Sequence, residues 1–130
     1  MITKIISWTL RIVAALILLQ TLYFKFTGHP DSVAIFEELG MEPTGRILIG
    51  VIELIAAILL LVPMSVAYGA LLGMGVMAGA IIGHITKLGF EGDNLSLGIL
   101  AFVVFFACAG VLFLHREQIP IIRRMLAKEA

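Results

Sequence analysis

Residues 45–63 read GRILIGVIELIAAILLLVP, an apolar stretch that is long enough to cross a lipid bilayer and that contains one carboxylate, Glu53. A membrane helix needs about 20 apolar residues to cross a hydrocarbon core of about 30 Å. A charge near the centre of such a helix costs roughly 3 kcal/mol, and ionisable residues there usually face protein or water rather than lipid. The stretch therefore predicts a membrane helix in which Glu53 faces its neighbours.

The composition of the whole chain is typical of a membrane protein. Of the 130 residues, 61% are hydrophobic and 14% are charged, whereas soluble domains have about 45–50% and about 25%. The formal net charge is zero, so nothing favours nucleic acid as a partner. Cys108 is the only cysteine, which excludes an intramolecular disulfide and a paired-cysteine redox relay within one chain.

Hydropathy and turn residues predict four membrane spans, at about residues 5–26, 44–62, 65–87 and 95–114. Only a few residues around Pro63 separate the second span from the third, and so short a connection requires antiparallel neighbours. The expected fold class is all-α: an integral membrane four-helix bundle with up-down topology, formed by residues 1–130 as one domain. The basic tail, residues 115–130, is expected to be an interfacial helix or extension.

The first loop, residues 27–44, is predicted to contain a short amphipathic helix. Pro30 is typical of a helix start, and Gly40 is typical of the residue that ends one. Ile35, Phe36 and Leu39 share one apolar side. We expect this helix to lie at the membrane surface over the end of the bundle.

The distribution of basic residues predicts the orientation. Four spans place both termini on one side, which carries six basic residues against three on the other side. The positive-inside rule then places both termini in the cytoplasm, and the expected membrane is the bacterial inner membrane. Arg11 lies one to two turns inside that side, and we expect its side chain to extend to the lipid headgroups.

Polar side chains from three spans are predicted to lie in the same half of the bundle, the half that is farther from the termini. At about 1.5 Å per residue, Glu53 lies roughly 12 Å below the start of its span, and Gln20 roughly 9 Å below the end of the first span. Lys25, Arg46, His84 and Lys87 lie near the ends of their spans on that same side of the membrane. The candidates for a polar core or a ligand site are Glu53, His84, Lys25, Gln20, Arg46 and Lys87. The sequence assigns no catalytic residue, and we expect no metal site.

The role of Glu53 has alternative interpretations. Arg46 shares its helix face but lies about 10 Å away along the axis, so Lys25 or His84 of a neighbouring helix is the favoured partner. The group is either an ion pair that fixes helix register, a site that binds a ligand or transfers protons, or a contact for lipid headgroups.

Three glycines repeat every four residues in the third span: Gly75, Gly79 and Gly83. This spacing lets helix backbones approach closely in lipid. The glycines either pack within the bundle or form a seam with a second copy or another membrane subunit.

In its motifs the chain resembles the DoxX and DoxX-like family of small four-helix membrane proteins. The motifs are YFKFTG at residues 23–28, FEELGMEP at residues 36–43, the spacing Gly50-x-x-Glu53, and a glycine-rich third span that ends at His84. The resemblance implies that Lys25, Glu53 and His84 form the polar core. Members of the family are similar to membrane subunits of thiosulfate:quinone oxidoreductases or to accessory factors of redox systems, and related animal proteins resemble receptor-assembly chaperones.

Residues and resemblance together favour a subunit or accessory factor in quinone-linked redox metabolism, with an outward-facing polar pocket around Glu53. Quinone is the candidate cofactor, and phenylalanines of the fourth span, such as Phe102 and Phe106, would hold its ring. Any enzyme activity would be that of a quinone-dependent oxidoreductase subunit acting with a partner. The alternatives are a non-enzymatic assembly factor or chaperone that binds partner transmembrane helices, or a small lipid- or solute-handling protein.

Overall fold

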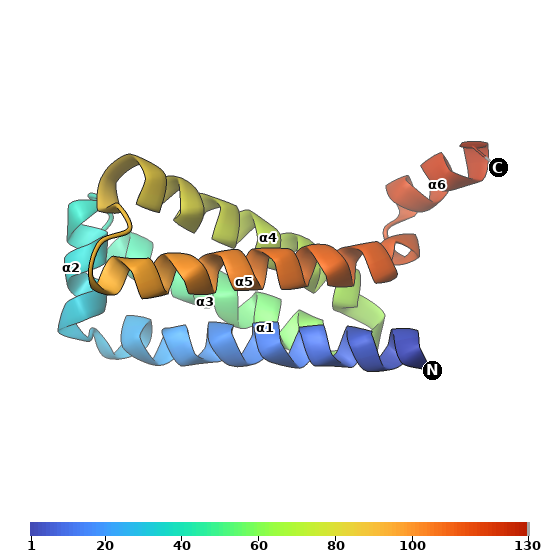
Figure 1. Ribbon diagram of the computed structural model, residues 1–130, viewed down its shortest axis with the longest axis horizontal. Helices are drawn as coiled ribbons and strands as arrows, with labels where there is room; N and C mark the ends of the chain where they lie inside the picture. The colour runs from blue at the N-terminus through green and yellow to red at the C-terminus, as the bar shows by residue number, and fades with distance from the viewer. Residues whose placement is uncertain (130) are drawn as a thin grey trace.

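The computed structural model describes residues 1–129, and these residues form helices without any strand (Figure 1). The long helices are α1 (Ile2–Thr27), α3 (Thr44–Leu61), α4 (Val66–Gly83) and α5 (Asp93–Leu114). The shorter elements are α2 (Pro30–Glu38), η1 (Pro63–Ser65), η2 (His84–Leu88), η3 (Arg116–Gln118) and α6 (Pro120–Glu129). The predicted all-α fold class is confirmed. Ala130, the last residue of the predicted tail, lies outside the described residues.

Residues 1–129 contain four helical segments that are long and apolar enough to span a membrane: Ile2–Thr27, Thr44–Leu61, Pro63–Leu88 and Asn94–Leu114. Each end lies within three residues of the predicted end, and the largest difference is at the first span, which begins at Ile2 rather than at residue 5. The third span includes η1 and η2 because the chain stays helical on both sides of α4.

The four long helices form a closed ring. Helix α1 packs against α3 and α5, and α4 packs against the same two helices. Figure 1 shows Met1 and α6 at one end of the bundle and α2 across the other end. We call these the terminal end and the loop end.

Small side chains fill the centre of the ring. Ala14, Ala15, Ala56, Ala57, Ala70 and Cys108 are buried there, together with larger residues such as Leu18, Leu60 and Val104. A Cβ atom at Gly69 would lie 2.6 Å from the Leu60 nitrogen, and one at Gly73 would lie 2.9 Å from the Cys108 Sγ. Gly69 therefore lets α4 come close to the backbone of α3, and Gly73 leaves room for the Cys108 side chain of α5.

The glycines predicted to pack lie in two different environments. A Cβ atom at Gly83 would lie 3.4 Å from Leu39, next to α2, whereas one at Gly75 or Gly79 would meet no atom of the described residues within 4 Å. Gly75 and Gly79 therefore face away from the bundle in this chain.

Helix α2 closes the loop end, where it contacts α1, α3 and η2. It begins at Pro30 as predicted, and the Nδ1 of His29 caps it by accepting a hydrogen bond from the Asp31 N–H at 3.2 Å. Phe36 is buried beneath it. Gly40 follows the helix with a φ of 74°, a left-handed conformation that glycine adopts without steric cost.

Helix α6 leaves the terminal end and projects away from the four long helices (Figure 1). It contacts η3. Ile121 and Met125 are exposed on it, and Arg123, Arg124 and Lys128 supply its positive charge. The combination of exposed apolar and basic side chains is typical of a helix that lies in a membrane interface.

Candidate functional site at the two ends of the bundle

An ion pair joins α1 to α3 in the half of the bundle nearer the loop end. The Nζ of Lys25 lies 3.1 Å from the Oε2 of Glu53, and the Thr21 hydroxyl donates a hydrogen bond of 3.0 Å to the same oxygen. Glu53 is 2% exposed. Of the two partners that the sequence favoured for Glu53, the structure shows Lys25.

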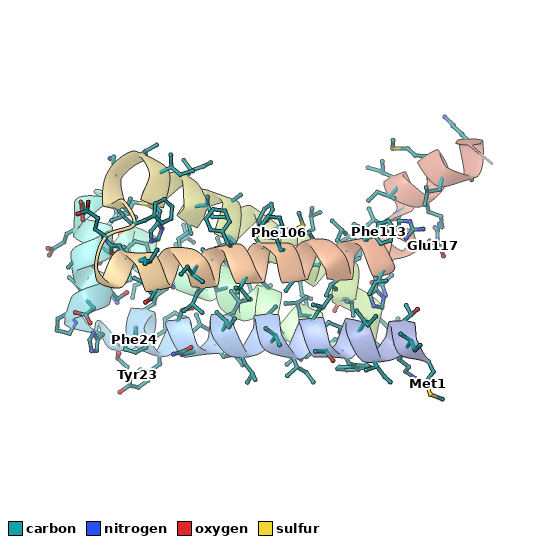
Figure 2. The ribbon with its side chains drawn as sticks, viewed as in Figure 1. Met1, Tyr23, Phe24, Phe106, Phe113 and Glu117 are labelled. Carbon is teal, nitrogen blue, oxygen red and sulfur yellow. The ribbon has the colours of Figure 1, made fainter. Side chains whose placement is uncertain are left out.

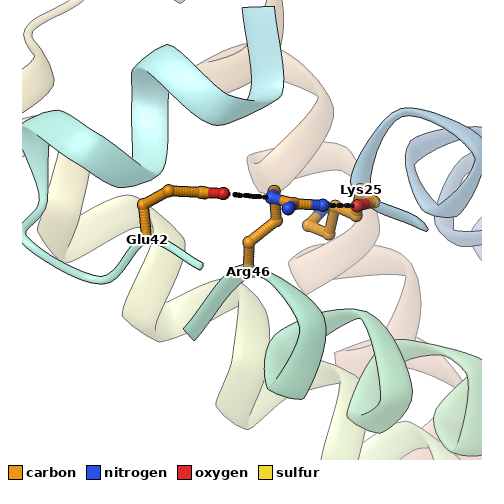
Figure 3. A network of polar contacts seen from close by, with 3 residues as sticks. All are labelled: Lys25, Glu42 and Arg46. Atoms are coloured by element: carbon orange, nitrogen blue, oxygen red, sulfur yellow. Dashed lines mark hydrogen bonds and ion pairs between the residues drawn. The ribbon is translucent and has the colours of Figure 1, made fainter. Parts of the chain in front are cut away.

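Arg46 forms a second polar contact between α3 and α1, closer to the loop end. Its Nε donates to the Glu42 carboxylate at 2.8 Å, and its Nη1 donates to the backbone oxygen of Lys25 (Figure 3). That oxygen belongs to the last turn of α1, where carbonyls have no partner within the helix. Arg46 therefore caps α1, and it pairs with Glu42 rather than with Glu53.

The structure does not bring all six predicted residues together. Gln20 and Lys87 are exposed, and neither makes a side-chain hydrogen bond or ion pair with another described residue. Gln20 has the predicted depth, but it lies five residues from Lys25 and thus about 140° around the helix. The polar core of the loop end consists of Thr21, Lys25, Glu42, Arg46 and Glu53.

His84 lies apart from this ion pair, at the start of the π-helical turn η2. Its Nδ1 is 2.9 Å from the backbone oxygen of Ala80. Because a carbonyl oxygen can only accept, Nδ1 carries the proton. The other ring nitrogen, Nε2, is buried and has no hydrogen-bond partner among the described residues. Single π-turns are frequent at functional sites.

A row of aromatic rings runs from His84 along α5. Phe90 stacks on the His84 imidazole with ring centroids 5.5 Å apart, followed by Phe102 at 6.5 Å from Phe90 and Phe106 at 6.4 Å from Phe102. Phe102 and Phe106 are exposed, and in the view of Figure 2 Phe106 lies at the edge of α5 that is nearer α4. In a bilayer these rings face lipid.

A second polar cluster, which the sequence did not predict, lies at the terminal end. Arg11 is 3% exposed, and its Nε donates a hydrogen bond of 2.6 Å to the backbone oxygen of Leu60. Its guanidinium carbon lies 3.6 Å from the centroid of the Trp8 ring. The expectation that Arg11 extends to the lipid headgroups is therefore wrong. The Leu60 carbonyl at the end of α3 has no partner within its own helix, and it gives the Arg11 side chain a hydrogen-bond acceptor inside the protein.

Ser7 and His115 complete this cluster. The Ser7 hydroxyl and the His115 Nε2 are 2.7 Å apart and are hydrogen-bonded, which joins α1 to the residue that follows α5. Burial and the nearby charge of Arg11 lower the pKa of His115 below its ordinary value. Figure 2 shows Met1 and Glu117 at this same end of the molecule.

Gln118 fixes the turn between α3 and α4 from the other side. Its Oε1 accepts a hydrogen bond from the Ala67 N–H, and its Nε2 donates to the Pro63 oxygen, both at 2.9 Å. The Ser65 hydroxyl donates to the Leu59 oxygen at 3.1 Å. A helix break after Leu61 leaves several carbonyls unpaired, and this is the sequence signal that could have pointed to polar partners here.

A family model described as the DoxX-like family matches residues 9–109. The matched range contains most of the four long helices and both Lys25 and Glu53. The chain belongs to the DoxX-like family. It is an integral membrane protein, as its four apolar spans also indicate. The comparisons with curated proteins and with solved structures gave no match to the chain.

In this DoxX-like protein the two ends of the bundle offer different chemistry. The Glu53 carboxylate is enclosed by Lys25 and Thr21, whereas His84 and Arg11 each have a buried nitrogen without a partner among the described residues. Residues 1–129 contain no group of three or more His, Cys, Asp or Glu side chains placed to hold a metal ion. Among the described residues, the buried side-chain nitrogens that have no partner in the protein are therefore those of His84 and Arg11.

Proposed function

We propose that this DoxX-like protein is a subunit or accessory factor of a quinone-linked redox system, and that it binds the reduced quinol at His84. The observation that carries the proposal is the buried Nε2 of His84, which has no hydrogen-bond partner among the described residues. A buried polar atom without a partner is costly, so such atoms usually have a reason to persist.

The tautomer of His84 selects the form of the ligand. Since Nδ1–H donates to Ala80, a neutral His84 presents Nε2 only as an acceptor. A quinol hydroxyl can donate to it, whereas the carbonyl oxygen of an oxidised quinone cannot. When a partner subunit oxidises the quinol, two electrons pass to the partner and two protons are released, one of them to Nε2.

The aromatic row supplies the apolar surface for the ring. A quinol ring would replace Phe90 on the imidazole, and Phe102 and Phe106 would contact the ring edge and the isoprenoid tail. Their exposure to lipid provides a lateral route from the bilayer. Phe90 lies between Gly89 and Gly92, both of which have positive φ.

The ion pair between Lys25 and Glu53 has a supporting role in this proposal. Its enclosure favours a clamp that fixes the register of α1 against α3. The predicted polar pocket around Glu53 stays a prediction, and the ligand-binding atom that we propose belongs to His84 instead.

The distribution of basic residues supports both termini in the cytoplasm of a bacterial inner membrane. Lys4, Arg116, Arg123, Arg124 and Lys128 lie toward the terminal end, and this excess is expected on the cytoplasmic side. In that orientation His84 lies toward the non-cytoplasmic surface.

The test is binding of decyl-ubiquinol, kept reduced without oxygen, to the full chain in lipid nanodiscs. We expect saturable binding to the wild type, weakened about tenfold in His84→Leu, which corresponds to the loss of one buried hydrogen bond. Thr86→Val, an exposed change in the same turn, is the matched control and should bind as the wild type does. Binding no greater than partition into protein-free nanodiscs, or equal binding by His84→Leu, would overturn the proposal.

A second function is favoured by a separate observation, the open faces of Gly75 and Gly79. Small residues four positions apart allow another membrane helix to approach α4 closely. In this alternative the protein is an assembly factor that binds partner helices or a second copy of itself. Gly79→Leu should then abolish association measured by energy transfer between labelled chains in liposomes, without change in the chain's own unfolding. Association that survives Gly79→Leu contradicts this alternative.

A further inference from the structure

The terminal end of the bundle contains a cleft of about 600 Å³. One face of α1 supplies its polar wall through Lys4, Ser7 and Arg11, which follow the spacing i, i+3, i+7. The rest of the lining consists of Met1, Thr3, Trp8, Pro63, Leu114 and His115. The cleft is at the opposite end from His84, so it is independent of the proposed quinol site.

Arg11 is a buried cation whose charge is not balanced by any acid among the described residues. Its Nε is bonded to a neutral carbonyl, and its Nη2 is buried and has no hydrogen-bond partner among the described residues. No described carboxylate forms an ion pair with it, since the ion pairs of the described residues involve Lys25, His29 and Arg46. A buried guanidinium without a counter-charge is costly to retain.

The other groups on the cleft do not neutralise this charge. Lys4 adds a second positive charge, and the lowered pKa of His115 keeps its ring neutral near pH 7. The Ser7 hydroxyl and the His115 ring, already paired with each other, lie on the same wall. The cleft therefore combines two cations with no described acid on its lining.

We propose that this cleft binds the oxyanion group, a carboxylate or a phosphate, of an amphiphile from the leaflet at the terminal end, and that Arg11 is its principal partner. A guanidinium can hold either oxyanion through two parallel hydrogen bonds. One can come from Nη2, which has no partner among the described residues, while Lys4 attracts the anion to the mouth of the cleft.

The apolar part of the lining explains why the ligand is an amphiphile. Trp8, Pro63 and Leu114 line the same cleft as the cations. Arg11 lies nine residues into α1, or about 13 Å along its axis. The hydrocarbon tail of a ligand whose anionic group is bound there would therefore lie along the apolar surface. Trp8, the only tryptophan of the chain, contacts Arg11 and reports on the site.

The experiment is a titration followed by Trp8 fluorescence, with the full chain in neutral detergent at fixed ionic strength. The probes are dioctanoyl phosphatidate, inorganic phosphate and zwitterionic dioctanoyl phosphatidylcholine. We expect a saturable change in emission with phosphatidate and none with phosphatidylcholine. An equal response to inorganic phosphate would support the oxyanion site and identify free anion rather than lipid as its source.

Variants decide whether Arg11 carries the binding. Arg11→Gln should weaken phosphatidate binding about tenfold or more, the loss expected for a charge-assisted contact. Arg116→Gln removes the same charge outside the cleft lining and should leave the titration unchanged. If Arg11→Gln fails to fold, Lys4→Gln, at an exposed position, should still weaken binding several-fold. No saturable response in the wild type, or the same affinity in the folded Arg11 or Lys4 variant, would overturn the proposal.

Discussion

Lys25 of α1 and Glu53 of α3 form an ion pair between neighbouring membrane helices, with Nζ and Oε2 3.1 Å apart. Removing one partner leaves an uncompensated buried charge, which typically costs 3–5 kcal/mol. We therefore expect Lys25→Met to lower the free energy of unfolding by about 3 kcal/mol, measured by titration with sodium dodecyl sulfate from mild micelles.

The double variant Lys25→Met with Glu53→Leu should be more stable than Lys25→Met alone, because no charge is left without a partner. Gln20→Leu is the matched control on α1, since Gln20 is exposed, and should change stability little. If the effects of Lys25→Met and of Glu53→Leu, each measured alone, simply add in the double variant, the two residues do not act as a pair that holds α1 against α3.

Gly69 and Gly75 predict opposite effects of the same substitution. A Cβ atom at Gly69 would lie 2.6 Å from the backbone of α3, so Gly69→Ala should lower the free energy of unfolding by about 1–3 kcal/mol. Gly75 faces open space, so Gly75→Ala should be neutral or stabilise the helix by up to about 1 kcal/mol. The measurement is the same detergent titration. A greater loss for Gly75→Ala than for Gly69→Ala would contradict the packing of α4 on α3.

His115 predicts a dependence of stability on pH. Burial and Arg11 lower its pKa in the folded protein, so in the window below its ordinary value of about 6.5 the unfolded chain binds more protons. The neutral His115 ring therefore contributes to stability above a pH of about 6.5, and this contribution is lost as the pH falls toward the lower pKa that His115 has in the folded protein. Thermal unfolding between pH 8 and pH 5 should show this loss in the wild type. The loss should be smaller in His115→Asn, and an equal loss in that variant would contradict the assignment.

The sequence predicted the helices well because long apolar runs and proline or glycine breaks determine their ends locally. The pairing of Glu53 with Lys25 could also be anticipated, since both lie in the half of the bundle nearer the loop end and a buried acid needs a partner. Depth along a helix does not define direction around it, however. For this reason Gln20 was predicted for the polar core although it faces outward.

The polar cluster at the terminal end shows what local patterns do not reveal. Arg11 near a span end is compatible with extension to the headgroups, and only the tertiary arrangement places the orphan oxygen of Leu60 within its reach. His115 and Gln118 likewise acquire their partners from residues 108 and 51 positions away in the chain. Such contacts depend on how the four helices are arranged, which hydropathy does not specify.

The orientation of the bundle can be measured through its single cysteine. Cys108 is buried, and in a Cys108→Ala background a new cysteine can be placed at either end. We expect Glu38→Cys, in α2 at the loop end, to react with a membrane-impermeant maleimide on intact bacterial cells expressing the chain. Glu117→Cys, at the terminal end, should react only after permeabilisation. The reverse pattern would contradict cytoplasmic termini.

The most direct test of the proposed function is nitrogen-15 NMR of the full chain labelled at its histidines, before and after addition of decyl-ubiquinol. Without ligand, the Nδ1 shift of His84 should be that of a protonated ring nitrogen, as the hydrogen bond to Ala80 requires. Quinol should move the Nε2 resonance of His84 and leave that of His115, at the other end of the bundle, in place. An Nε2 resonance of His84 that does not move under saturating quinol would contradict the proposed site.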